Sequence, residues 1–488
     1  MAKRKKSSRS PQARHSKKAT PSRHDKRKRL QNPNPSRKKT VQAKVPLTAR
    51  LAAISASLQM VLHGRIAFRL GIIFSGAILA GDLRTASAWF QAAGVNDDWD
   101  VFYDALISIG RSAASIATPL LQLIVAKFDP GPNGYWKMVL DDSPTKRYGR
   151  HVEGANVHHN PTAGPADGEW LYGHNWVCLA MLMNHSRWGT IALPILSMLY
   201  VRQCDVATLD AKYGWEFLTK HQIALNLLTR AVGILRALGS KAKMLVVFDG
   251  AYAARKLIEG LLELNVTIVS RLRSNAKLFD LPGQRKPGQR GRSRKYGENR
   301  IVLAQLAARD DDWTPISYVC RGATVLRRYK TFLATTPLVG RPIRVVMVDY
   351  GNGSWAAYFS TDANMEEEMI LETVAERWAI EEFFHDVKEV WGAGQQQVRN
   401  VWSNIACWNI NGWLYAMVEI DSWDKEKSEL VDRFDRPWDN VSRRPSHADR
   451  RRTIAREMLK NQFFQILGQR QSDEKTRAAL TDLINLAA

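Results

Sequence analysis

One predicted helix carries a carboxylate between two cations. Arg377, Glu381 and Lys388 are separated by four and then seven positions. At about 100° per residue their side chains fall within one stripe of a helix. An apolar stripe lies beside it, formed by Ile380, Phe384, Val387 and Trp391. Such a helix can pack on a core and present Glu381 between two positive charges. The alternative is an ordinary surface Arg–Glu pair with an unrelated lysine.

Two further acids follow short apolar segments. Asp142 comes after Met138-Val-Leu140, and Asp249 comes after Met244-Leu-Val-Val-Phe248. If these segments are neighbouring strands, the two carboxylates can converge at one edge of the sheet. Carboxylate oxygens are hard ligands that suit Mg²⁺ or Mn²⁺. The alternative is that each aspartate caps a turn or a helix.

The first acid is ambiguous because Asp141 directly precedes Asp142. Successive residues of a strand face opposite sides of the sheet. Only one of these two carboxylates can therefore point into a shared site.

The elements that would position these acids alternate between strands and helices. Three apolar strands are followed by a helix, a strand, a second helix and a last strand. This order favours an α/β fold with a mixed central sheet, such as the ribonuclease-H-like fold, although other α/β folds share the alternation. In chain order we predict strands at 136–140, 175–183 and 190–200, a helix at 214–238, a strand at 244–248, a helix at 252–264 and a strand at 266–270.

The chain divides into segments of different character. Residues 47–130 have the spacing of helices and form either a DNA-binding domain or a structural bundle, whereas 274–362 alternates short strand-like runs, Ile301–Leu306 among them, with turns. From Asn364 to Trp391 one long helical pattern resumes. We expect a disordered basic tail (1–46), a helical domain (47–130), a ribonuclease-H-like core in two parts (131–273 and 363–425), a β-rich insertion (274–362) and a helical C-terminal region (426–488).

Composition and charge narrow the function classes. The chain has 488 residues, of which 45% are hydrophobic and 24% charged, which excludes full disorder, a collagen-like fibre and a coiled-coil rod. The net charge is +24, and residues 1–50 hold 18 Lys or Arg against one acid, Asp25. A second basic segment is the Gly/Pro-rich loop 282–297, with Arg292, Arg294 and Lys295 among its cations. This balance favours a polyanionic partner, nucleic acid first and an anionic membrane surface second.

Cysteine usage and hydropathy indicate a soluble cytosolic protein. The four cysteines include no Cys-x-x-Cys pair, so neither a zinc ribbon nor a disulfide framework is expected. The N-terminus is charged throughout and does not resemble a secretory signal. The apolar run Leu70–Ala80 has about half the length that a membrane span requires.

Several of these motifs, in this order, resemble DDE transposases of bacterial insertion sequences, in the branch with a Tyr-Arg-Glu-Lys signature. Arg377, Glu381 and Lys388 fit the spacing of the signature, but its tyrosine position is Val374. The β-rich insertion before the third acid is also a feature of this branch. Further matching segments are Leu140-Asp-Asp-Ser-Pro-Thr-Lys146, Gly173-His-Asn-Trp-Val177, Val246-Val-Phe-Asp-Gly-Ala-Tyr252, Gly392 and Arg399.

The resemblance implies a function and a site. Asp142, chosen over Asp141 from the family's motif, would hold two divalent cations, Mg²⁺ or Mn²⁺, together with Asp249 and Glu381. The chain would then be a cytoplasmic, nucleoid-associated bacterial enzyme that cleaves and transfers DNA strands at the ends of an insertion sequence. Its expected partners are double-stranded DNA, at element ends and at the target, and a second copy of the chain on paired ends. The expected DNA-binding residues are Arg377, Lys388, Arg399, Arg292, Arg294 and Lys295.

Two alternatives remain open from the sequence. The first is a basic DNA-binding protein without catalysis, which the cationic tail and the loop 282–297 would also explain. The second is a ribonuclease-H-like nuclease that hydrolyses DNA without joining strands.

Overall fold

A mixed sheet forms the centre of the computed structural model, which describes residues 43–131, 133–160, 168–285, 290–431, 438–440, 442–467 and 474–487. Five strands lie side by side in the order β4-β3-β1-β5-β6. β3 is antiparallel to β1 and β4, whereas β1, β5 and β6 are parallel. The fold is therefore mixed α/β and consistent with the predicted ribonuclease-H-like fold. The bounds are β1 (Tyr135–Lys146), β3 (Trp170–His185), β4 (Gly189–Tyr200), β5 (Lys243–Phe248) and β6 (Val266–Leu272).

Hydrophobicity explains the central position of β5. Its residues from Met244 to Phe248 are all buried, as expected for a strand covered on both faces. The connections between the parallel strands contain helices α7 (Lys220–Ala237) and α8 (Arg255–Glu263). α7 begins with a capping box in which Thr219 and Gln222 bond to each other's backbone N–H groups. The predicted helix start at 214 was therefore six residues too early.

β1 is longer than its apolar sequence predicts. The strand was expected to end before Asp141, yet it continues to Lys146 and stays paired with β3 throughout. Asp141 and Asp142 therefore lie within a strand, opposite Cys178 and Val177 of β3.

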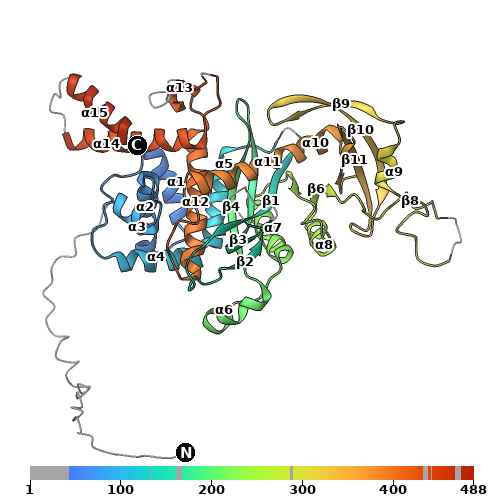
Figure 1. Ribbon diagram of the computed structural model, residues 1–488, viewed down its shortest axis with the longest axis horizontal. Coiled ribbons are helices and arrows are strands. Elements are labelled where there is room, and N and C mark those ends of the chain that lie inside the picture. Colours follow the sequence, from blue (N-terminus) through green and yellow to red (C-terminus); the bar gives the residue numbers. More distant parts are fainter. Residues whose placement is uncertain are drawn as a thin grey trace, which may run out of the picture. The chain divides into compact units, whose positions relative to one another are not determined.

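Helix α12 (Val401–Ser422) is the buried helix beside the sheet. Every residue of α12 except Trp402 is buried, and the helix contacts both α4 and β4 (Figure 1). At Gly110 of α4 an added Cβ would lie 1.9 Å from the carbonyl oxygen of Trp402, so only glycine permits this close approach. The helices before the sheet are α1 (Ala49–Gln59), α2 (Gly64–Leu79), α3 (Ala86–Ala92), α4 (Trp99–Arg111) and α5 (Ala113–Lys127).

The segment between β6 and α10 extends the sheet away from β1. β12 pairs with β6, and the order continues through β11, β10, β7 and β8, with β9 on β10 (Figure 1). The strand predicted at Ile301–Leu306 is wrong: after Ile301 the chain forms α9, because Leu303-Ala-Gln-Leu-Ala-Ala308 consists of good helix formers. The elements are β7 (Leu278–Phe279), β8 (Arg300–Ile301), α9 (Leu303–Ala308), β9 (Thr314–Cys320), β10 (Ala323–Thr335), β11 (Pro342–Gly351) and β12 (Ser354–Ser360).

The helical pattern predicted over 364–391 forms two helices rather than one. α10 (Glu367–Glu376) and α11 (Trp378–Glu389) are separated at Arg377. The remaining elements are β2 (Asn156–His159), a 3₁₀ turn (Gln203–Asp205), α6 (Val206–Tyr213), α13 (Lys427–Leu430), α14 (His447–Leu467) and α15 (Glu474–Ala487).

Residues 42–488 form one compact unit. The domain boundaries drawn from the sequence stay predictions, and the basic tail lies, up to residue 42, outside the described residues. All four cysteines are free. In the described part of the chain, no helix alone is long and apolar enough to cross a membrane, although the bent pair α4–α5 passes on length and composition.

A buried charge network joins α14 to α12. Glu419 of α12 is 1% exposed and accepts hydrogen bonds from His447 at 2.6 Å and Arg450 at 3.1 Å. Burial opposes the ionisation of Glu419, but the Arg450 charge and the bond from His447 outweigh it and lower its pKa. The carboxylate is therefore the ionised partner of a buried ion pair.

Glu419→Ala should lower the free energy of unfolding by about 3–5 kcal/mol, because it leaves the Arg450 charge buried without a partner. The matched control is Glu259→Ala, which removes an exposed ion pair with Arg255 and should cost below about 0.5 kcal/mol. Denaturant unfolding of both variants measures the difference. Equal losses would show that the Glu419 network does not hold α14 in place.

Candidate active site

Successive side chains of β1 point to opposite faces of the sheet, so the adjacent Asp141 and Asp142 face opposite sides. In the parallel pairing of β1 with β5, Leu140 lies opposite Phe248, so the next residues, Asp141 and Asp249, reach the same edge of the sheet. Side chains at paired positions point to the same face. Asp142, one residue further on, points to the other face.

A single guanidinium bridges Asp141 and Glu381. Nη1 of Arg377 lies 2.9 Å from Oδ2 of Asp141, and Nη2 lies 2.6 Å from Oε1 of Glu381. Arg377 can do this because it stands at the break between α10 and α11, with Glu381 one turn further along α11. The two residues related by the predicted helical spacing, Arg377 and Glu381, are therefore in contact. Arg377 also binds a third residue, Asp141.

Asp249 adds a third carboxylate to this group. Its own carboxylate accepts bonds from the backbone N–H groups of Ala251 and Tyr252, which fixes it at the end of β5. The pKa of Asp141 is raised to about 7, mainly by burial; Arg377 lowers it and the charge of Asp249 raises it further. Asp141, Asp249, Arg377 and Glu381 thus form one electrostatic cluster, which we name the acid cluster.

Asp142 has different partners. Its carboxylate accepts hydrogen bonds from the hydroxyl of Tyr252 at 2.8 Å and from Nζ of Lys220 at 2.7 Å. Burial and the neighbouring Asp142 charge raise the pKa of Tyr252 well above its usual value, so the phenol stays protonated and donates. These bonds fasten β1 to the start of α7 and to the turn after β5.

Arg147 holds the chain that follows α11. Its Nε donates to Nδ1 of His174 at 3.1 Å, and its Nη1 donates to the carbonyls of Gly394 at 2.6 Å and Gln396 at 3.0 Å. Burial lowers the pKa of His174 to about 3, so the ring is neutral and Nδ1 can accept the bond. The buried guanidinium therefore ties the end of β1 to the segment after α11, and so helps to position Glu381.

The other predicted site residues occupy three places. Lys388 is half-buried in the last turn of α11, and Arg399 is exposed just before α12. The exposed Arg292, Arg294 and Lys295 lie between β7 and β8, at the end of the sheet order remote from β1 (Figure 1). The structure therefore does not bring this basic loop to the acid cluster.

Three polar contacts of the site were not predicted from the sequence. Tyr252 lies within a motif that was recognised, but its bond to Asp142 depends on the turn after β5. Lys220 and Arg147 lack a helical or strand spacing that relates them to the acids. Lys220 is 78 residues from Asp142, and the two carbonyls that Arg147 binds are 247 and 249 residues away. No local signal could have identified these two residues.

The acid cluster fits divalent cations in the kind of ligand it offers. It has carboxylate oxygens only, which Mg²⁺ and Mn²⁺ prefer. Burial is the main reason why the pKa of Asp141 is raised, and the charge of Asp249 raises it further, so a cation bound there would favour the ionised carboxylate. Within the described residues, no three His, Cys, Asp or Glu side chains are close enough together to hold a metal, and Arg377 stands between Asp141 and Glu381.

Comparison with known families supports the predicted resemblance. The family described as DDE superfamily endonuclease matches residues 62–319, slightly more than half of the chain, and includes both Asp141 and Asp249. The family described as transposase DDE domain matches residues 224–415 and includes Asp249, Arg377 and Glu381. A comparison with curated proteins gave no match. The chain belongs to the DDE superfamily of endonucleases and transposases.

Proposed function

We propose that this protein is a transposase that cleaves DNA and transfers strands at the ends of an insertion sequence, with Asp141, Asp249 and Glu381 as its acids. The observation that carries the proposal is the Arg377 bridge, which joins acids 240 positions apart at one edge of the sheet. Membership of the DDE superfamily supplies the reaction class. The branch with the Tyr-Arg-Glu-Lys signature remains part of this proposal.

The first acid in this proposal is Asp141 and no longer Asp142. Asp141 shares Arg377 with Glu381 and feels the charge of Asp249. Asp142 is already bonded to Tyr252 and Lys220 on the other face of the sheet. The choice drawn from the family's motif is therefore replaced by one that rests on the direction of the side chains.

Divalent metal use is implied by the family, typically Mg²⁺, and we propose two ions held by the three acids. Bound there, such cations activate an attacking oxygen and stabilise the leaving oxygen of an in-line displacement at phosphorus. The chain itself positions the DNA. Cations bound by Asp141 and Glu381 would take the place of Arg377, whose planar fork would then match two oxygens of a phosphodiester. Lys388 in the last turn of α11 would supply a point charge to the same backbone.

DNA is the substrate that the family implies, and the charge of the chain suits it. We propose that Arg399 and the loop with Arg292, Arg294 and Lys295 contact the duplex backbone away from the acid cluster. The insertion extends the sheet toward that loop, so it would support DNA well beyond the scissile phosphate. A homodimer on paired ends completes the proposal.

Asp141→Asn, Asp249→Asn and Glu381→Gln should each lower Mg²⁺-dependent cleavage by at least about 100-fold, because each removes a proposed metal ligand. The matched control is Asp142→Asn, which changes the neighbouring residue and should cleave at a rate within about 10-fold of the wild type. The assay uses a plasmid that carries the DNA flanking the gene on both sides. Loss of cleavage in Asp142→Asn with full cleavage in Asp141→Asn would reverse the assignment.

Metal binding can be followed without DNA. Mn²⁺ or Mg²⁺ should raise the melting temperature of the wild type at constant ionic strength, because a ligand that binds the folded state stabilises it. The rise should be absent in Asp141→Asn and retained in Asp142→Asn. Equal stabilisation of both variants would argue against a metal at Asp141.

Strand transfer separates a transposase from a nuclease that only hydrolyses DNA. An element end already cut to a 3′-hydroxyl should be joined to plasmid DNA by the wild type with Mg²⁺, and not by Glu381→Gln. Gel electrophoresis of a labelled end detects the joined product. Nicking of the end without any joined product would favour the nuclease.

A further inference from the structure

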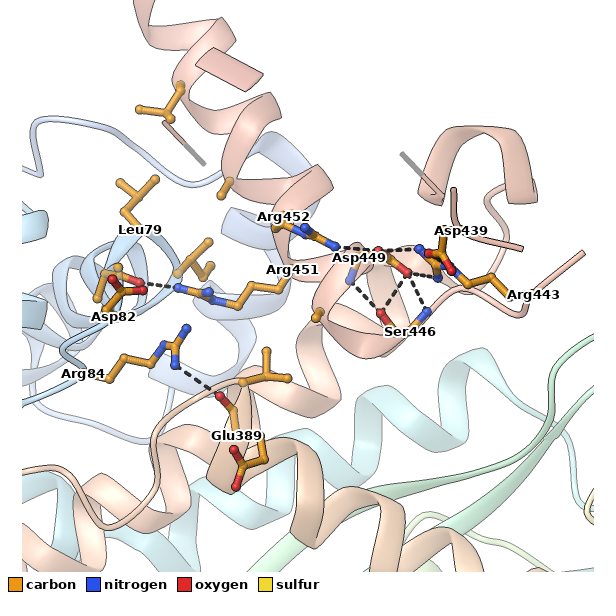
Figure 2. Close-up of a pocket in the computed structure, with 17 residues that line it drawn as sticks. Leu79, Asp82, Arg84, Glu389, Asp439, Arg443, Ser446, Asp449, Arg451 and Arg452 are labelled. Carbon is orange, nitrogen blue, oxygen red and sulfur yellow. Dashed lines mark hydrogen bonds and ion pairs between the residues drawn. The ribbon is translucent and has the colours of Figure 1, made fainter. Parts of the chain in front are cut away.

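A cavity of about 670 Å³ lies at the far end of α11 from Glu381. It is bounded by the end of α2, the chain at 80–84, the end of α11 and helix α14 (Figure 2). Its size is in the range of ligand sites. Two guanidinium groups, those of Arg84 and Arg451, lie next to one another on one side of it.

Arg451 is a buried charge that pairs with no carboxylate among the described residues. The residue is 8% exposed, donates to the carbonyl of Ala80 and lies over the ring of Trp391 at 5.3 Å. Its Nε is buried and has no hydrogen-bond partner in the part of the chain that the structure describes. Burial lowers the pKa of Arg451 to about 9, and the charges of Arg84 and Arg452 lower it further. A buried, incompletely bonded cation is costly in free energy unless something compensates it.

Arg84 also has a buried donor that bonds to none of the described residues. Its Nη1 donates to the carbonyl of Glu389 at 3.1 Å, while its Nε is buried and, among the described residues, unbonded. Burial lowers the pKa of Arg84, and the charges of Asp82 and Glu389 oppose that shift. Both arginines therefore line this cavity, and each has a buried Nε without a partner among the described residues.

The acids on the opposite wall do not compensate these arginines. Asp439 and Asp449 are both bonded to Arg443, and Asp449 also accepts a bond from Arg452 (Figure 2). The pKa of Asp449 falls to about 2 because the bonds from Arg443 and Ser446 outweigh the effect of burial. That side of the cavity is thus a closed ion-pair group. Asp82 and Glu389 act on Arg84 in part, and Arg451 remains the buried cation whose charge is least compensated.

We propose that the cavity binds a backbone phosphate of DNA through the paired guanidinium groups of Arg84 and Arg451. Guanidinium groups match phosphate oxygens in fork geometry, and an anion beside the two would compensate positive charge that lines the cavity. Eight residues of α11 separate Glu381 from Glu389, which is about 12 Å along the helix. Since a DNA strand carries one phosphate per roughly 3.4 Å of axis, the contact would fall about three or four nucleotides from the scissile phosphate.

The inference rests on the proposed function for the identity of the anion, and DNA binding under a salt series tests it. Arg84→Gln and Arg451→Gln, in the full chain, are titrated with a labelled duplex at several KCl concentrations. Each variant that loses a phosphate contact should show a slope of log K against log[KCl] shallower by about 0.9. Arg84 is only half-buried, so its variant should fold even if a change at the buried Arg451 does not.

The matched control is Arg230→Gln, which removes the same charge from an exposed position on α7. Its slope should equal that of the wild type. The inference is overturned if Arg84→Gln keeps the wild-type slope, or if Arg230→Gln changes the slope equally.

In a second experiment, inorganic phosphate replaces chloride at constant ionic strength. If phosphate raises the melting temperature of the wild type but not of Arg84→Gln, while the DNA slopes are equal, the cavity takes free phosphate and the DNA contact is wrong.

The outcome is separable from that of the proposed function. Mg²⁺-dependent cleavage by the wild type tests the proposed function, whereas the salt slopes of the variants test the anion site. Absence of cleavage by the wild type would count against the proposed function and not against the anion site.

Discussion

The arrangement of the site depends on one guanidinium held between two carboxylates. Asp141 and Glu381 come from distant parts of the chain and would repel each other if both were ionised without a cation nearby. Arg377 resolves this repulsion with bonds of 2.9 and 2.6 Å. Arg377 stands between α10 and α11, one turn before Glu381, and from there it also contacts Asp141 of β1.

The surrounding structure keeps these groups in place by burial and by bonds between distant segments. β1 continues through both aspartates because β3 pairs with it as far as Lys146, so the two side chains are assigned to opposite faces. The bonds of Asp142 to Tyr252 and Lys220 fasten β1 to α7 and to the turn after β5. The bonds of Arg147 fasten the C-terminal end of β1 to the chain after α11. Two adjacent acids thus have two roles: Asp142 fastens elements together, and Asp141 joins the acid cluster.

The sequence predicted the order of the core strands along the chain well. Each of these strands is an apolar run bounded by turn residues or by helices, whose hydrophobic residues recur with a different period. It also predicted the Arg377–Glu381 contact, since both residues belong to one local helical stripe. Strand alternation left Asp141 and Asp142 open, because it states that they face opposite sides but not which side holds Glu381, and the family's motif favoured Asp142. Long-range contacts such as that of Arg147 with Gly394 leave no local pattern in the sequence from which they could be predicted. The short helix α9 was mistaken for part of a strand at Ile301–Leu306.

The central claim is that Asp141, rather than Asp142, shares a metal site with Asp249 and Glu381. Anomalous scattering from Mn²⁺ in crystals of the protein tests it most directly, because the method places the ion without any assumption about activity. We predict a manganese ion at about 2.1 Å from carboxylate oxygens of Asp141 and at least one of the other two acids. A manganese ion bound by Asp142, with Asp141 still paired to Arg377, would contradict the account.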